Sequence, residues 1–223
     1  MPYGVTLRVS GPRACFTRPE FKVERSSYDV ITPSAARGIL EAIHWKPAIR
    51  WSIDRIHVLK PIRFQSLRRN EVGEKIPVAS IRTAMRGGSV WALRQIAGED
   101  RQQRATTFLV DVDYLVEAHI TLTPQAGIED CAAKHLAMFA RRASRGQCFH
   151  QPYLGTREFP ADTELWEAPA PRHSLPNDQC NRDLGPMLLD IDYENDRASM
   201  FFHAVLRDGV LAVPPLSSRE VAS

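Results

Sequence analysis

The sequence predicts an α+β fold, in which a ferredoxin-like domain with an antiparallel sheet carries a small C-terminal β-hairpin appendage. Three observations favour this fold. Two segments repeat apolar residues at the helical period, residues 108–122 alternate as a strand does, and the elements follow the order strand, helix, strand, excursion, strand, helix, loop, hairpin. We expect the domain over residues 1–168, and a linker with the appendage over residues 169–223.

The first strand and the first helix are predicted near the N-terminus. Residues 4–10 (GVTLRVS) have the composition of a strand. In the segment 32–47, Thr32 can cap a helix, Pro33 suits its first position and Pro47 ends it. This helix would have an apolar face and a second, polar face that carries Arg37, Glu41 and His44.

A second strand is predicted over residues 48–62, and a long excursion follows it. Residues 64–103 are polar and weakly patterned, which is typical of functional or disordered insertions in a compact domain. We expect part of this excursion to be mobile. A β-α-β-β-α-β core with a strand or two hidden in the excursion fits the order of the elements.

The clearest strand signal lies in residues 108–122 (FLVDVDYLVEAHITL). One face would be apolar from Phe108 to Leu122, and the open face would carry Asp111, Asp113, Glu117, His119 and Thr121. A helix over residues 127–144 would follow, with Gly146 as its C-cap. We expect helices to cover one face of the sheet and to leave the other face open, as in RNA-recognition domains.

The C-terminal part reads as a linker and a hairpin. Residues 168–183 are rich in proline and polar residues, and two apolar segments at 187–193 and 200–214 read as strands. Asp208-Gly209 suits the tight turn of a hairpin.

Composition excludes several classes of protein. No apolar run of the 223-residue chain approaches the roughly 18–20 residues of a membrane span, and the N-terminus has no signal-peptide pattern, so we expect a cytoplasmic protein. The four cysteines form no C-x-x-C pair and no zinc-ligand spacing, so we expect free thiols, mostly buried, with no metal and no cofactor. They are Cys15, Cys131, Cys148 and Cys180.

The basic residues indicate a phosphate-rich partner. The net charge is only +3, but 24 of the 29 basic residues are arginine, whose planar fork suits phosphates and stacks on bases. A GC-rich genome would give the same bias. In residues 11–31, Arg18 and Lys22 lie among aromatic residues, as on surfaces that track a nucleic-acid backbone; an ordinary solvated loop is the alternative.

Three long stretches resemble one known family. Residues 16–51, 61–73 (PIRFQSLRRNEVG) and 146–161 (GQCFHQPYLGTREFPA) are similar to the CRISPR-associated family-five proteins of subtype I-C, members of the RAMP superfamily. The resemblance implies an endoribonuclease that cuts the repeat hairpin of precursor CRISPR RNA and then stays on the 5′ handle of the mature RNA. It also implies backbone and large subunits of a surveillance complex as partners, and duplex DNA as a further ligand.

The resemblance also assigns RNA-binding residues. The segment 146–161 is similar to the glycine-rich loop of this superfamily, in which Gly146 and Gly155 would allow close approach to a phosphate, Arg157 would neutralise it and Tyr153 would stack on a base. Packing of the aromatic residues against the core is the alternative for Tyr153. Arg37 completes the predicted RNA-binding set with Arg18 and Lys22.

Candidate catalytic residues follow from the same comparison. Cleavage without a metal needs a base for the 2′-OH, a cation for the phosphorane and an acid for the leaving oxygen. His119 matches a catalytic His of the family, whereas Glu117 and Ala118 occupy the place of its Lys and His44 that of its Tyr. His44 and His119 could act as an acid–base pair, with Lys46 as the cation. The competing hypothesis is a non-catalytic subunit that binds the handle.

Overall fold

The computed structural model describes residues 4–21, 23–96, 98–192 and 196–222. In chain order its elements are β1 (Val5–Ala14), β2 (Arg25–Ser26), α1 (Pro33–Ile43), β3 (Ile49–Val58), β4 (Phe64–Val72), α2 (Val78–Met85), η1 (Val90–Leu93), β5 (Arg101–Leu122), α3 (Ala132–Ala143), β6 (Asp162–Leu165), α4 (Asn177–Cys180), β7 (Arg182–Asp192), β8 (Ala198–Arg207) and β9 (Val210–Ala212).

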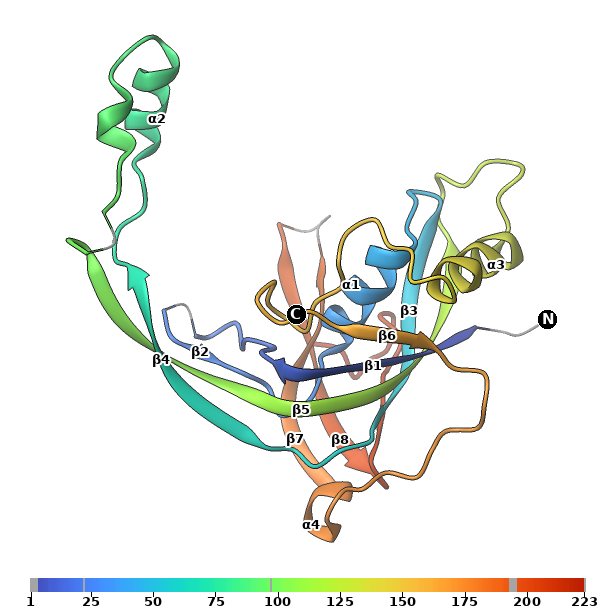
Figure 1. Ribbon diagram of the computed structural model, residues 1–223. Coiled ribbons are helices and arrows are strands. Elements are labelled where there is room, and N and C mark those ends of the chain that lie inside the picture. Colours follow the sequence, from blue (N-terminus) through green and yellow to red (C-terminus); the bar gives the residue numbers. More distant parts are fainter. Residues whose placement is uncertain (1–3, 22, 97, 193–195, 223) are drawn as a thin grey trace.

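The predicted ferredoxin-like core is confirmed. Its strands lie in the order β6-β1-β5-β3, and every neighbouring pair is antiparallel. With α1 after β1 and α3 after β5, the chain follows the predicted β-α-β-β-α-β path. Thr32 caps α1 as expected, because its hydroxyl accepts a hydrogen bond from the amide of Ala35, and Pro33 occupies the first turn. Both helices lie on the inner side of a strongly curved sheet (Figure 1).

Strand β5 is longer than the sequence predicted and holds the sheet together. It spans 22 residues and pairs with β1, β2, β3 and β4 (Figure 1). Strand β4 comes from the predicted excursion and pairs with the first half of β5, from Phe64 opposite Leu109 to Val72 opposite Arg101. It is a strand of the kind that the sequence analysis predicts within the excursion. Most side chains of β4 are exposed, and an exposed strand does not need an apolar face. Its sequence therefore shows no apolar alternation from which it could be predicted.

The second face of β5 is less open than expected. Leu115 is buried, and Asp113 is buried in a two-pronged ion pair with Arg8 of β1, at 3.0 and 2.8 Å. His119 and Glu117 remain half-buried on that face. The apolar face is buried from Val112 to Ile120, as the alternation predicted.

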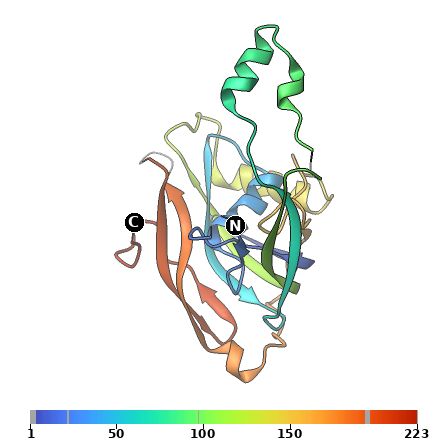
Figure 2. The same cartoon turned by 90° about the vertical axis from the view of Figure 1, so that its left-hand side faces the viewer.

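The C-terminal strands extend the same sheet. Asp208 and Gly209 both have positive φ, 50° and 73°, and connect β8 to β9 in the predicted tight turn. Strand β9 pairs with the end of β3, and α1 packs on β7. Strands β7–β9 stand beside the core when the molecule is turned (Figure 2). The division of the chain at residue 168 remains a prediction.

Residues 73–96 and 98–100, which we call the arm, project from the ends of β4 and β5 away from the core (Figures 1 and 2). They contain α2 and η1, and no residue of α2 is buried. Apolar side chains are exposed along the arm; these include Val78, Met85, Val90 and Trp91. The arm is therefore held by its two roots and not by a core of its own.

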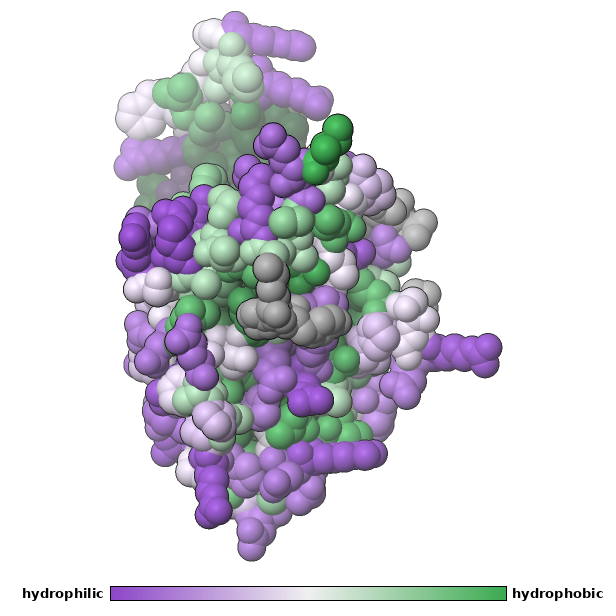
Figure 3. Space-filling view, turned by 90° about the vertical axis from the view of Figure 1, so that its right-hand side faces the viewer, coloured by the Kyte–Doolittle hydropathy of each residue, from purple (hydrophilic) through white to green (hydrophobic). Residues whose placement is uncertain are grey.

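The exposure of the cysteines agrees only in part with the sequence analysis. Hydrophilic residues cover most of the α3 end, with apolar ones in small areas between them (Figure 3). All four cysteines are free thiols, but only Cys15 and Cys180 are buried, so the expectation of mostly buried thiols is wrong for Cys131 and Cys148. Among the described residues, no helix is long and apolar enough to cross a membrane.

Candidate active site and nucleic-acid interface

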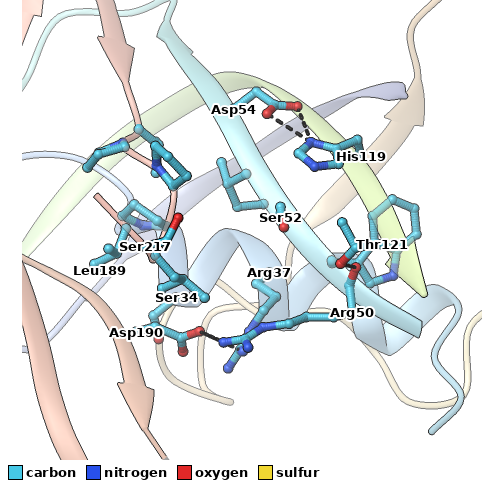
Figure 4. Close-up of a pocket in the computed structure, with 17 residues that line it drawn as sticks. Ser34, Arg37, Arg50, Ser52, Asp54, His119, Thr121, Leu189, Asp190 and Ser217 are labelled. Carbon is cyan, nitrogen blue, oxygen red and sulfur yellow. Dashed lines mark hydrogen bonds and ion pairs between the residues drawn. The ribbon is translucent and has the colours of Figure 1, made fainter. Parts of the chain in front are cut away.

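A cavity lies where β3 and β5 face α1 and β7. Its volume is about 540 Å³, and residues 213–217 border it on the C-terminal side. It opens beside the part of β3 that β9 does not cover, because β9 pairs only with Arg55–His57. Figure 4 shows the polar side chains of the four elements pointing into this space. The fold thus leaves a hollow with both polar and apolar lining beside the candidate catalytic strand.

His119 lies in this cavity and is held by Asp54. Its Nδ1 lies 2.9 Å from both carboxylate oxygens of Asp54, and 17% of its side chain is exposed. A carboxylate only accepts hydrogen bonds, so Nδ1 carries a proton and donates it. Nε2 is then the nitrogen whose proton can be exchanged, which suits a general acid or base. Figure 4 shows the two side chains facing each other across β3 and β5.

Two arginines share the cavity. Arg37 of α1 and Arg50 of β3 both donate to the same carboxylate oxygen of Asp190, at 2.8 and 3.4 Å (Figure 4). Arg37 also lies 3.6 Å from Glu41, whose pKa is raised by burial. Arg50 is the more exposed of the two arginines and is the cation best placed to meet a phosphate. Arg37, predicted to bind RNA, is thus at the site but is paired with acids.

The structure does not bring His44 to His119. His44 follows α1 in an extended conformation and is 1% exposed, so it does not lie on the helix's polar face as we had expected. Its Nε2 lies 3.0 Å from Nδ1 of His135 on α3, and the two rings stack. Lys46 is exposed and does not line the cavity of His119. The residue before it, Trp45, is also exposed.

The buried histidine pair predicts a loss of stability in acid. Burial, followed by the nearby Arg142 and His135, lowers the pKa of His44 from 6.5 to about 4. Between these values only the unfolded chain binds the proton, so the free energy of unfolding should fall by about 2–3 kcal/mol as the pH drops from 6.5 to 4. Urea unfolding at a series of pH values measures this fall in the free energy of unfolding.

The control for this prediction is a His44→Gln variant, which cannot titrate at that position. Its stability should depend less on pH over the same range. The exposed His150, which forms no ion pair with the described residues, gives a matched substitution, and His150→Gln should keep the wild-type dependence. Equal pH dependence in His44→Gln and wild type would contradict the assignment.

Glu117, which the sequence placed beside His119, has partners of its own. Its carboxylate contacts Nε2 of His57 at 2.6 Å and Arg55 at 3.7 Å. Its carboxylate is therefore paired with two side chains of β3, and these contacts hold β3 and β5 together.

The glycine-rich loop is anchored by its own glycines. Gly146 has φ +63° and ends α3, as predicted, with its amide bonded to the carbonyl of Ala143. Gly155 has φ +84°, and a Cβ there would collide with the backbone carbonyl of Cys15. Both glycines are explained by the path of the chain, before any phosphate is considered.

Aromatic side chains of this loop divide into two groups. Phe159 packs on Phe108 of the sheet and fixes the loop to the core. Tyr153 is half-buried and stacks on His150, which meets Phe149 edge to face. Phe149 is 90% exposed, which is costly for an apolar ring unless it has a partner. The row from Phe149 to Tyr153 therefore resembles a platform on which bases can stack.

The other predicted RNA-binding residues differ in how available they are to a ligand. Arg157 is exposed and forms no hydrogen bond or ion pair with the residues that the structure describes, so it can meet a ligand. Arg18 is paired with Asp29 at 3.2 Å and lies over the ring of Tyr28, which fixes it within the protein. Lys22 lies outside the described residues. Over the described part of the chain, no group of three or more His, Cys, Asp or Glu residues is arranged to hold a metal.

Sequence reasoning missed Asp54 and Arg50. Both lie on β3, in the strand that was predicted, at positions that alternate with the buried Trp51 and Ile53. Their alternation with buried residues was a usable signal, but the residues that they contact are set by tertiary structure. Asp54 reaches His119 because β3 and β5 are paired, with Ser52 opposite His119.

Comparison with known proteins identifies the family of the chain. The sequence model of the family Cas_Cas5d, described as CRISPR-associated protein (Cas_Cas5), matches residues 4–214. The chain belongs to the Cas5d family. Two curated relatives are named CRISPR pre-crRNA endoribonuclease Cas5d. One, from Mannheimia succiniciproducens, is 55% identical over 97% of both chains. The other, from Thermus thermophilus, is 42% identical over 96% of this chain and 93% of its own.

The Cas5d fold also matches a solved structure. A crystal structure described as a CRISPR-associated protein superimposes with a TM-score of 0.70 over 99% of this chain and 96% of its own, at 24% identity. At that level of identity the match supports the fold alone.

Proposed function

We propose that this Cas5d-family chain is an endoribonuclease that cuts the repeat hairpin of precursor CRISPR RNA without a metal. The observation that carries the proposal is the His119–Asp54 pair in a cavity that also holds Arg37 and Arg50. The names of the two curated relatives support the same substrate and reaction.

The reaction follows from the chemistry of these groups. Nε2 of His119 takes the proton of a ribose 2′-OH, and the 2′ oxygen attacks the adjacent phosphorus. The bond from phosphorus to the 5′ oxygen breaks, and that oxygen receives a proton from water while His119 releases its own to solvent, which leaves a 2′,3′-cyclic phosphate and a 5′-hydroxyl. The exposed guanidinium of Arg50 stabilises the added negative charge of the phosphorane. Asp54 keeps His119 in the tautomer that the first step needs.

The product would stay bound through the glycine-rich loop. In this proposal Arg157 neutralises a phosphate of the 5′ handle, and Tyr153 and Phe149 stack on its bases. The chain would then serve as a subunit of a type I-C surveillance complex with the backbone and large subunits. The exposed apolar and basic side chains of the arm support a role in such contacts, with Trp91 and Met85 as the largest apolar groups.

The experiment that tests this function is incubation with the cognate repeat RNA in excess EDTA. We expect one cut, with a 2′,3′-cyclic phosphate on the upstream product, at a rate that EDTA does not change. Mass spectrometry of the products identifies the ends. Tight binding with intact RNA would favour the competing hypothesis of a non-catalytic subunit, and cleavage lost in EDTA would overturn metal independence. Duplex DNA of the repeat sequence, added as a competitor, separates RNA binding from general nucleic-acid binding.

A further inference from the structure

A cluster of three arginines lies between the root of the arm and the glycine-rich loop. Arg25 comes from β2, Arg69 from β4 and Arg104 from β5, where Arg69 and Arg104 are opposite each other in the sheet. Two carboxylates hold them together. Glu71 of β4 contacts all three arginines, and Glu158 of the loop contacts Arg25 at 3.4 Å and Arg69 at 3.1 Å.

The cluster has more donors than acceptors. Three guanidinium groups face two carboxylates, which leaves one positive charge in excess. The Nε–H groups of Arg69 and Arg104 are buried and have no hydrogen-bond partner among the described residues. The hydroxyls of Thr106 and Thr156, on β5 and on the loop, are buried in the same way, and Thr106 as a whole is 3% exposed. Unpaired buried polar groups are costly, so another acceptor would stabilise this region.

Glu158 is the member of the cluster that can leave most easily. Its side chain is 55% exposed, whereas that of Glu71 is 25% exposed. The residue lies on the loop, two positions after the unpaired Thr156, and shares that loop with the exposed Arg157. A backbone phosphate presents two charged oxygens, as a carboxylate does, and binds arginine forks in the same way. A phosphate could therefore replace the Glu158 carboxylate.

We propose that Arg25, Arg69 and Arg104 form a binding site for a backbone phosphate of unpaired RNA, and that Glu158 occupies this site in the free protein. The proposal rests on the proposed function in one respect, since it takes RNA as the ligand. It does not depend on cleavage. RNA entering the site would displace Glu158, and the loop and the arm root would then contact the same phosphate.

The test compares two variants that remove the same charge. Glu158→Gln frees the arginines, whereas Glu167→Gln removes an exposed carboxylate that contacts no cation in the described part of the chain. The probe is a labelled single-stranded oligouridine of about 12 nucleotides, titrated at several salt concentrations. We expect Glu158→Gln to bind about 5–10-fold more tightly than Glu167→Gln. Arg25→Gln should bind more weakly and lower the salt slope by about 1.

The outcomes separate this inference from the proposed function. Equal or weaker binding by Glu158→Gln relative to Glu167→Gln would show that Glu158 only braces the loop, and would overturn the phosphate site. A thermal unfolding curve for each variant identifies loss of folding; if Glu158→Gln does not fold, the Arg25→Gln result decides, because Arg25 is partly exposed. If the wild type does not bind the oligouridine at any salt concentration, the site fails, and the proposed function is decided separately by cleavage of the cognate repeat RNA. If the wild type binds and cuts RNA while Glu158→Gln gains nothing, only this inference fails.

Discussion

Replacement of His119 by alanine should slow the single-turnover cleavage of repeat RNA by about 10²–10⁴-fold, because it removes the group that exchanges a proton with the reacting ribose. RNA affinity should stay close to that of the wild type, since the phosphate and base contacts lie elsewhere. Quenched-flow cleavage and a separate binding titration measure the two quantities. Asp54→Asn should keep the affinity and lose part of the rate, because the amide no longer holds His119 in one tautomer as a carboxylate does.

The molecule contains a matched control for this substitution. His203 on β8 forms the same kind of pair with Asp183, at 2.9 Å, but it does not line the cavity. His203→Ala should therefore cleave at the wild-type rate. Full activity in His119→Ala would exclude His119 from the chemistry and would favour the non-catalytic hypothesis.

Gly155→Ala should lower the free energy of unfolding by about 2–4 kcal/mol. The new methyl group would lie 2.6 Å from the carbonyl carbon of Cys15, in a backbone conformation that alanine rarely adopts. The loop cannot move aside freely, because the amide of Cys15 donates to the carbonyl of Leu154 and Leu154 is fully buried. Urea unfolding at neutral pH measures the loss.

Gly146→Ala is the matched control for steric contact. Gly146 also has positive φ, but no atom lies within 4 Å of the position that a Cβ would take. Its substitution should cost about 1 kcal/mol, from backbone strain alone. Equal losses in the two variants would mean that the contact with Cys15 does not fix the loop.

The core of the fold was predictable because its signals are local. Caps, helical period and strand alternation are properties of neighbouring residues, and Thr32, Gly146 and Asp208-Gly209 all do what their positions indicated. Strand β4 gave no such signal. Its polar side chains are stabilised by pairing with β5, so the information that makes it a strand lies in a partner 29 to 45 residues away, from Val72–Arg101 to Phe64–Leu109.

The site was predictable only in part, for a related reason. His119 could be found from strand alternation and from the family resemblance, but the partner of a histidine is fixed by tertiary structure. Asp54 reaches His119 only because β3 and β5 are paired. His44 fails as its partner because one extended residue after α1 turns the ring inward against His135. Helical periodicity does not describe a residue that has left the helix.

The dependence of four strands on β5 also sets the order in which this chain folds during synthesis. In the described chain, β2 and β4 pair with β5, β1 pairs with β5 and β6, and β3 pairs with β5 and β9. Each of these pairs includes β5 or a strand that follows it in the sequence. No part of this sheet can therefore form until residues 101–122 have left the ribosome. Until then the nascent chain exposes several apolar strands without partners, and α1, with 11 residues, is too short to be stable alone. A protein built around one late strand needs to be kept apart from other copies until that strand arrives.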